Sequence, residues 1–145
     1  MFNIIYSVNN RCFMQKGGKK IEVKGDIDEY IDSICLIGGT TFKGSVQASK
    51  KLLPKTNKVP IYIPCFDDYI IPLASPISND CIWLSAKNYL TCYERDERTF
   101  IRFKDHTTFE VLFSKFTIRM QYRKYLQLNE IREDMKIKYN ELKEW

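Results

Sequence analysis

Histidine is nearly absent from this sequence of 145 residues, in which His106 stands alone. It lies in the run Lys104-Asp105-His106-Thr107, which is typical of a hairpin turn. A serine or cysteine nucleophile would have to recruit its base from that turn. The glycine pairs at 17–18 and 38–39 form neither a phosphate-binding nor a dinucleotide-binding loop. These absences favour a protein that is not an enzyme.

Closely spaced cysteine pairs are missing as well. The chain has five cysteines but no CxxC motif, so it lacks the paired ligands of a usual structural zinc site. We therefore expect no metal and no cofactor. The absence of paired spacing also favours reduced, buried thiols, which is the state of cysteine in the cytoplasm. The five are Cys12, Cys35, Cys65, Cys81 and Cys92.

Long hydrophobic runs are absent too, and none approaches the roughly 20 residues that a membrane-spanning helix needs. The first seven residues, MFNIIYS, contain neither a basic region nor a cleavage site for export. A composition of 44% hydrophobic and 28% charged residues excludes a disordered chain. We expect a cytoplasmic protein without a membrane partner, folded as one domain over residues 1–145.

Acidic residues are missing from two stretches of a chain whose net charge is +5. No Asp or Glu occurs between Asp32 and Asp67, or between Glu110 and Glu130. These basic stretches predict a surface for a polyanion, provided that folding brings them together. Two ordinary solvated faces are the alternative. We predict DNA contacts at eight cations: Lys43, Lys50, Lys51, Lys55, Lys58, Lys115, Arg119 and Arg123.

Short runs of alternating hydrophobicity, separated by turn residues, predict a single α+β domain with an antiparallel core of eight or so strands. One short basic helix and a long C-terminal helix complete the expected fold. Residues 28–34 are ambiguous, because the pattern fits a helical turn or a strand. The expected strands lie near residues 2–8, 12–15, 20–24, 59–63, 69–73, 81–85, 89–93, 99–104 and 108–113.

The short helix begins after Thr40 or Thr41 as N-cap, extends to about residue 53 and ends at Pro54. The long helix, residues 115–145, begins after Ser114. Its apolar residues recur at nearly 3.5-residue spacing, which predicts packing on the sheet or pairing with a second copy in a homo-oligomer. This stripe is Ile118, Tyr122, Tyr125, Leu128, Ile131, Met135, Tyr139 and Leu142.

Several strand residues are expected in the core, and two acidic clusters are not. Asp67-Asp68 and the acids of residues 94–97 are flanked by turn residues and are predicted to be solvated. Cys35 and Cys81 are predicted to be unpaired thiols. The residues predicted to be buried are Cys35, Cys81, Trp83, Phe103, Phe109 and Val111.

A set of motifs follows in a distinctive order. Cys35 is followed by Gly39-Thr40-Thr41-Phe42-Lys43-Gly44, and then by Asn57-Lys58-Val59-Pro60-Ile61. Ile71-Pro72 and Ser75 precede Cys81-Ile82-Trp83-Leu84-Ser85. This order and spacing resemble the ComK-type competence transcription factors, as do the hairpin at 99–113 and the pair Tyr122-Arg123. The chain departs from the family pattern at Ser45, where the family has Arg, and at Pro64, near a family Asp.

The resemblance implies a cytoplasmic DNA-binding activator of competence genes. It implies an oligomer on A/T-rich promoter boxes that engages the minor groove and bends the duplex. It also implies that an adaptor protein delivers some members to a protease. A narrow A/T minor groove concentrates negative potential and attracts Lys and Arg, which fits the basic stretches.

A small β-rich module for single-stranded nucleic acid, RNA or a protein is the alternative. Exposed aromatics on a strand face near the basic residues would favour that alternative. A duplex binder would instead present Lys and Arg on loops and helix ends. The aromatic residues whose exposure distinguishes the two are Tyr89, Tyr93 and Phe100.

Overall fold

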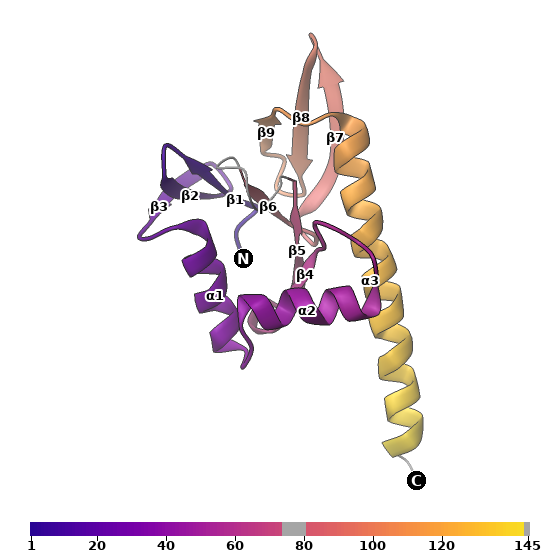
Figure 1. Cartoon of the computed structure of the whole chain (residues 1–145). Coiled ribbons are helices and arrows are strands. Elements are labelled where there is room, and N and C mark those ends of the chain that lie inside the picture. The colour runs from indigo at the N-terminus through magenta and orange to yellow at the C-terminus, as the bar shows by residue number, and fades with distance from the viewer. Residues whose placement is uncertain (74–80, 144–145) are drawn as a thin grey trace.

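A computed structural model of the chain, which describes residues 1–73 and 81–143, contains two antiparallel sheets and three α-helices (Figure 1). The larger sheet has the strand order β3-β2-β1-β6-β5-β4, and the smaller has the order β7-β8-β9. This confirms the predicted α+β class. The strands are β1 (Ile4–Val8), β2 (Arg11–Lys16), β3 (Lys19–Val23), β4 (Ile61–Ile63), β5 (Asp68–Pro72), β6 (Ile82–Ser85), β7 (Tyr89–Arg95), β8 (Arg98–Phe103) and β9 (Thr108–Val111).

The hairpin turns follow from residues that tolerate a left-handed backbone. Asn9 and Asn10 have φ of 50° and 62° and join β1 to β2, because asparagine adopts such angles at low cost. His106, with φ of 71°, lies in the turn between β8 and β9 as predicted. Ser75 and the last two residues of the predicted C-terminal helix lie outside the described residues.

The ambiguous stretch is a helix, α1 (Ile27–Ile37), whose N-cap is Asp26. The short basic helix, α2 (Phe42–Leu52), has Thr41 as N-cap, and the Thr41 hydroxyl accepts from the Gly44 N–H at 2.9 Å. A single 3-10 turn, η1 (Pro64–Phe66), follows β4. Sequence periodicity left residues 28–34 open because the segment is short and has only three apolar residues, Tyr30, Ile31 and Ile34, which are too few to define a period.

Two buried clusters lie on opposite faces of the larger sheet. Neighbouring residues along a strand alternate between them: Ile70 and Trp83 join the cluster under α1 and α2, whereas Ile71 and Leu84 join the cluster under α3 and the smaller sheet. This alternation is the period of two that a pleated strand imposes. The sheet is therefore covered on both faces.

The long helix, α3 (Lys115–Lys143), covers the second cluster only with its first half. Ile118 and Leu128 are fully buried, whereas Met135, Tyr139 and Leu142 on the same stripe are 52–69% exposed. In Figure 1 the helix runs down the side of the body and continues past α2. None of the described helices is long and apolar enough to cross a membrane.

Most of the predicted core is confirmed. Cys35, Cys81, Trp83, Phe103 and Val111 are buried, and all five cysteines are free thiols. Burial raises the pKa of the Cys12 and Cys81 thiols to about 11, so both are protonated at neutral pH.

Three expectations about burial are wrong. Cys65 is exposed, although all five cysteines were expected to be buried. Phe109 is only half-buried: it packs at the margin of the core, with its ring centre 4.9 Å from that of Tyr6. Asp68 is 3% exposed and is the first residue of β5, although its neighbour Asp67 is solvated as expected. The sequence does not reveal that the turn before β5 ends between these two acids.

Candidate nucleic-acid interface

The first acid-free stretch contains the C-terminal end of α2 and a basic loop, residues 53–60. Lys50 and Lys51 lie in the last turn of α2, where positive charge complements the helix dipole. Lys55 and Lys58 follow in the loop, and all four side chains are exposed. Both loop lysines have left-handed backbones, with φ of 60° and 52°.

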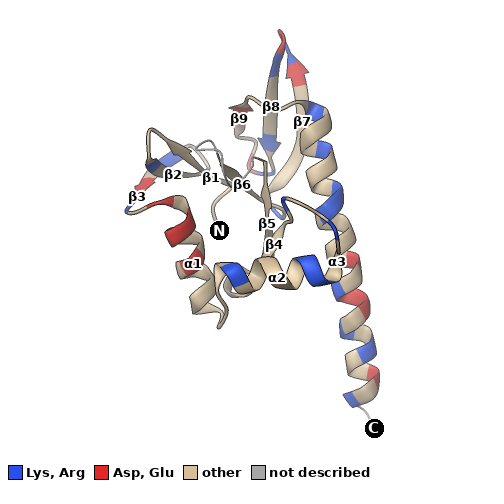
Figure 2. Ribbon diagram, in the orientation of Figure 1, with Lys and Arg blue, Asp and Glu red and all other residues tan. Residues whose placement is uncertain are grey.

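The basic loop is attached to the first half of α3. The Gln121 side-chain amide donates to the Lys58 carbonyl at 2.8 Å and to the Pro72 carbonyl at 2.6 Å. The Lys124 ammonium donates to the Asn57 carbonyl at 2.8 Å. Folding therefore brings the two acid-free stretches into contact, and Figure 2 shows blue segments of the loop beside the upper, acid-free half of α3.

Positive charge is left uncompensated at this contact. Burial lowers the pKa of the Lys124 ammonium, and the nearby charge of Lys58 lowers it further. Within residues 1–73 and 81–143, none of the eight predicted DNA contacts forms an ion pair; the four ion pairs found there are Arg11–Glu22, Lys87–Asp67, Arg98–Glu110 and Lys136–Glu133.

The predicted cations of α3 lie on a different flank of the helix. Arg119 and Arg123 are exposed and Lys115 is half-buried. Burial raises the pKa of the Tyr89 hydroxyl in β7, and the nearby charge of Arg119 opposes part of that rise. Because Gln121 and Lys124 face the basic loop, the predicted line of cations and the loop occupy two sides of one helix.

Lys43 faces acidic residues rather than the basic loop. It lines a groove between α1 and α2, together with Lys50 and the acidic residues Asp28, Glu29 and Asp32 of α1. The stretch around Lys43 is free of acids in the sequence but faces acids in space.

Position 45, where the family pattern has Arg, does not contribute to this surface. Ser45 is buried, and its hydroxyl donates to the Cys35 sulfur at 3.7 Å. The side chain points into the α2 interface, away from solvent.

The three aromatic residues that distinguish the alternatives differ in exposure. Tyr89 is buried. Tyr93 and Phe100 are half-buried and stack on each other with ring centres 5.4 Å apart. The Arg102 guanidinium lies 5.3 Å from the Tyr93 ring centre. This aromatic pair belongs to the β7–β8 hairpin, whereas the basic loop contacts α3.

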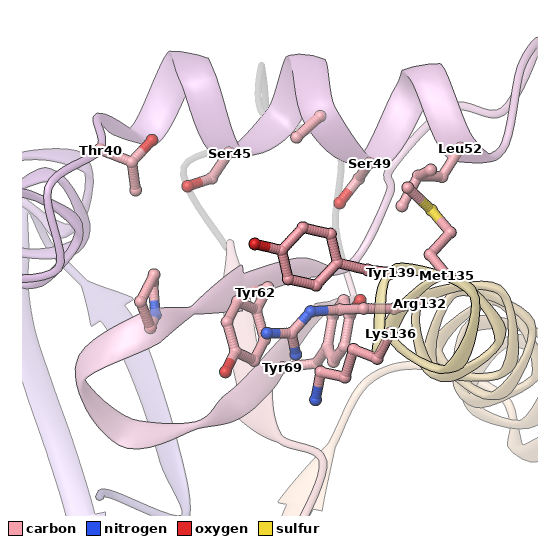
Figure 3. Close-up of a pocket in the computed structure, with 12 residues that line it drawn as sticks. Thr40, Ser45, Ser49, Leu52, Tyr62, Tyr69, Arg132, Met135, Lys136 and Tyr139 are labelled. Carbon is pink, nitrogen blue, oxygen red and sulfur yellow. The ribbon is translucent and has the colours of Figure 1, made fainter. Parts of the chain in front are cut away.

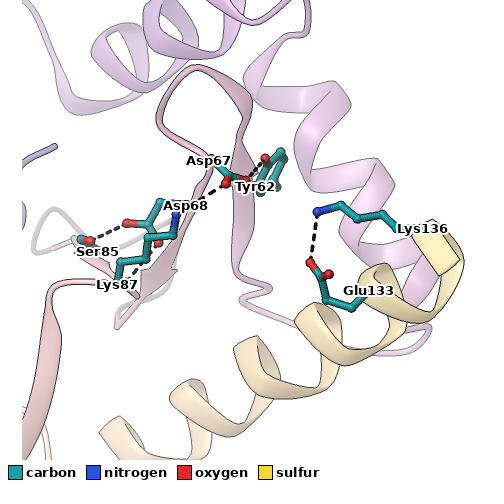
Figure 4. A network of polar contacts seen from close by, with 7 residues as sticks. All are labelled: Tyr62, Asp67, Asp68, Ser85, Lys87, Glu133 and Lys136. Atoms are coloured by element: carbon teal, nitrogen blue, oxygen red, sulfur yellow. Dashed lines mark hydrogen bonds and ion pairs between the residues drawn. The ribbon is translucent and has the colours of Figure 1, made fainter. Parts of the chain in front are cut away.

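A polar network beside α3 has a structural role (Figure 4). The buried Asp68 carboxylate accepts from the Ser85 hydroxyl and from the Lys87 N–H, which ties β5 to the end of β6. Burial raises the pKa of Asp68 although these donors oppose the shift. The described part of the chain contains no group of three His, Cys, Asp or Glu side chains that could hold a metal ion.

An apolar groove of about 540 Å³ separates α2 from the second half of α3 (Figure 3). We call it the α2–α3 groove. Leu52, Met135 and Tyr139 line it, together with Tyr62, over whose ring the Arg132 guanidinium lies at 3.3 Å from the centre. The groove is bordered by the exposed part of the α3 stripe.

Lys124 is one of the four cations of the second acid-free stretch, but it is not among the eight predicted DNA contacts. Asn57 appears in the sequence only as the start of a family motif, and no role was predicted for Gln121. No signal in the sequence identifies Gln121, since its partners lie 63 and 49 residues away.

Comparison with known proteins gives one family. Residues 6–137, which are most of the chain, match the model of the family described as ComK protein. No curated protein and no solved structure matches the chain.

Proposed function

We propose that this chain, which belongs to the ComK family of competence-related transcription factors, activates competence genes by binding A/T-rich double-stranded DNA through the minor groove. The family consists of transcription factors and not of enzymes. What we propose beyond family membership is that the target is double-stranded DNA, that its sequence is A/T-rich and that the protein binds in the minor groove.

One observation carries the proposal: the basic loop is hydrogen-bonded to the acid-free half of α3. Two basic stretches that are separate in the sequence thereby add their fields at one place. A surface of that kind attracts the phosphate backbone, which supplies most of the affinity of proteins for DNA. The exposed cations around this contact are Lys50 and Lys51 at the end of α2, Lys55 and Lys58 in the loop, and Arg123 on another flank of α3.

Preference for A/T-rich boxes would come from the groove. A narrow A/T minor groove has an enhanced negative potential, and loop lysines or arginines inserted into it read its width as well as its bases. Lys58 and Arg123 are our first candidates for insertion, because the motifs around them match the family best. Replacing either should reduce the preference for A/T-rich DNA, whereas replacing a phosphate contact should weaken all duplexes alike.

Three further statements accompany this proposal. We propose that the protein acts in the cytoplasm and as a homo-oligomer, and that a proteolytic adaptor controls it as the resemblance implies for some members of the family. A module for single-stranded nucleic acid, RNA or a protein is the competing function, and the stacked Tyr93 and Phe100 beside Arg102 are the observation that favours it.

The test is binding of the full chain to an A/T-rich duplex, a G/C duplex and a single strand over a series of salt concentrations. We expect the A/T-rich duplex to bind most tightly. The double variant Lys50→Ala/Lys51→Ala should weaken binding to both duplexes and reduce the slope of log K against log salt by nearly two, since each phosphate contact contributes about 0.9. Lys19→Ala/Lys24→Ala, two exposed lysines at and just after β3 that form no ion pair in the described structure, is the matched control and should change neither.

Tighter binding to the single strand would replace the proposal with the competing function. Equal affinity for all three nucleic acids would refute the A/T preference, and wild-type protein that binds neither duplex would refute the DNA-binding function altogether.

A further inference from the structure

We propose that Gln121 is a positioning residue that fixes the basic loop to α3, so that Lys58 and Lys124 form one preorganised clamp for a DNA phosphate. This inference rests on the proposed DNA-binding function. It adds a defined phosphate subsite and the residue that builds it, neither of which follows from the charge pattern of the sequence.

The Gln121 amide joins three parts of the fold. The residue is 4% exposed, and its nitrogen donates to the carbonyl of Lys58 in the loop and to the carbonyl of Pro72 at the end of β5. An amide nitrogen has two hydrogens, so both are used. The amide thus holds the loop at a fixed position relative to the sheet and to α3.

The backbone of the loop needs such a restraint. Lys58 has φ of 52°, in the left-handed region that a residue with a Cβ adopts only where its surroundings hold it. Gln121 supplies a contact to the carbonyl of that same residue. With its carbonyl bonded inward, Lys58 keeps its side chain exposed to solvent.

The second lysine of the clamp is fixed from the other side. The Lys124 ammonium donates to the Asn57 carbonyl at 2.8 Å, next to the residue that Gln121 holds. Lys58 and Lys124 are close enough for the charge of one to lower the pKa of the other, and neither has an acidic partner in the described structure.

Two lysines on segments that hydrogen bonds hold together, neither with an acidic partner in the described residues, favour an anion between them. A phosphodiester of the DNA backbone has the required charge and oxygen acceptors. Because the loop is already ordered, binding would not have to order it first, so the affinity depends on Gln121 without contact between Gln121 and DNA.

The experiment compares Gln121→Met, which keeps the length and burial but lacks the donors, with Gln127→Met, the same change at an exposed position six residues along α3. Lys58→Ala is made alone and in the Gln121→Met background. Amide hydrogen exchange at residues 55–59 reports on the loop without DNA, and salt-dependent binding to the A/T-rich duplex reports on the clamp.

We expect Gln121→Met to speed exchange at residues 55–59, to weaken DNA binding about tenfold and to lower the salt slope by at least 0.9, the contribution of about one phosphate. Lys58→Ala should weaken wild-type binding and have little further effect in the Gln121→Met background, because the two changes disable the same contact. Gln127→Met should match the wild type in every measurement.

A folded Gln121→Met protein with the wild-type affinity and salt slope would overturn the inference, since a purely structural amide changes stability alone. So would additive losses in the double variant. If Gln121→Met fails to fold, a cycle of Lys58→Ala and Lys124→Ala decides instead: coupled losses support the clamp, and additive losses reject it. Failure of the proposed function is seen separately, as wild-type protein that binds no duplex.

Discussion

Burial of the Asp68 carboxylate reduces the stability of the folded state. The residue is 3% exposed, and the loss of water around the carboxylate raises its pKa above the ordinary value of 3.8. Hydrogen bonds from the Ser85 hydroxyl and the Lys87 N–H recover only part of that loss. The native state therefore holds the Asp68 proton more tightly than the unfolded chain does.

This shift has a defined sign. Between pH 3.8 and the raised pKa, the native state binds more protons than the unfolded state, so the free energy of unfolding falls as pH rises through that window. Asp68→Asn removes the titration and keeps one acceptor. We expect its stability relative to the wild type to increase with pH, by about 1.4 kcal/mol for each unit by which the pKa is raised. Urea unfolding between pH 4 and pH 7 measures the difference.

The neighbouring residue provides the control. Asp67 is exposed, and hydrogen bonding from the Tyr62 hydroxyl together with the Lys87 charge lowers its pKa. The proton-linked stabilisation by Asp67 therefore builds up below pH 3.8 and is complete above it, so Asp67→Asn should show a nearly constant stability difference from the wild type between pH 4 and pH 7. Parallel pH profiles for the two variants would show that burial does not govern Asp68.

The contrast between these two acids shows what the sequence can predict about single residues. Alternating apolar residues placed Trp83, Phe103 and Val111 in the core, because each lies in a strand whose period is visible locally. The burial of Asp68 depends on Ser85, 17 residues away, and no local pattern contains that pairing. Phe109 and Val111 share β9 and its local pattern, yet only Val111 is buried, so the tertiary arrangement decides the burial of Phe109.

At the scale of elements, α2 begins where the sequence indicates but is fixed by two groups. The Thr41 hydroxyl accepts from the Gly44 N–H at 2.9 Å. The Asp32 carboxylate of α1 accepts from the Phe42 N–H, also at 2.9 Å. This second cap comes from α1 and ties the two helices together. It could not be predicted from the sequence, because the pattern at residues 28–34 fits either a helical turn or a strand.

We expect Thr41→Ala to lower the free energy of unfolding by about 1 kcal/mol, because an N-cap hydroxyl satisfies a backbone donor of the first turn. Thr40→Ala is the matched control, since the Thr40 hydroxyl makes only a 3.5 Å contact with the Thr41 carbonyl. Chemical denaturation of both variants measures the difference. Equal losses of stability in the two variants would show that the Thr41 hydroxyl is not a specific N-cap of α2.

The candidate interface was also predictable only in part. The acid-free stretches are visible in the sequence, and so are their lysines. Their contact depends on Gln121 and Lys124, whose partners are backbone carbonyls of a distant loop. Backbone carbonyls have no sequence signature, which is why the pattern indicated the charge of the surface but not its assembly. The acids of α1 opposite Lys43 were missed because the pattern at residues 28–34 did not predict a helix that packs beside α2.

At the scale of the whole molecule, α3 is packed over its first half and unpartnered over its second. The buried residues Ile118 and Leu128 continue along one stripe into Met135, Tyr139 and Leu142, which are exposed at the edge of the α2–α3 groove. A helix extension without packing is only marginally stable in water. A second copy of the chain, presenting the same stripe, would cover both the stripe and the groove in a two-fold arrangement. We propose this surface as the interface of the homo-oligomer.

We expect the wild type to sediment as a dimer or larger species, and Tyr139→Glu/Leu142→Glu to shift it toward the monomer. Burying two carboxylates without partners would cost more than a typical interface contact contributes.

Ile137→Glu is the matched control: Ile137 is 57% exposed on the opposite side of the helix, and its replacement should leave the association unchanged. The thermal midpoints of both variants should stay close to the wild type at concentrations where all are monomeric, because neither position belongs to the core of one chain. An association state that is the same in the wild type and the double variant would place the oligomer interface elsewhere, and dissociation by Ile137→Glu alone would assign it to the outer face of α3.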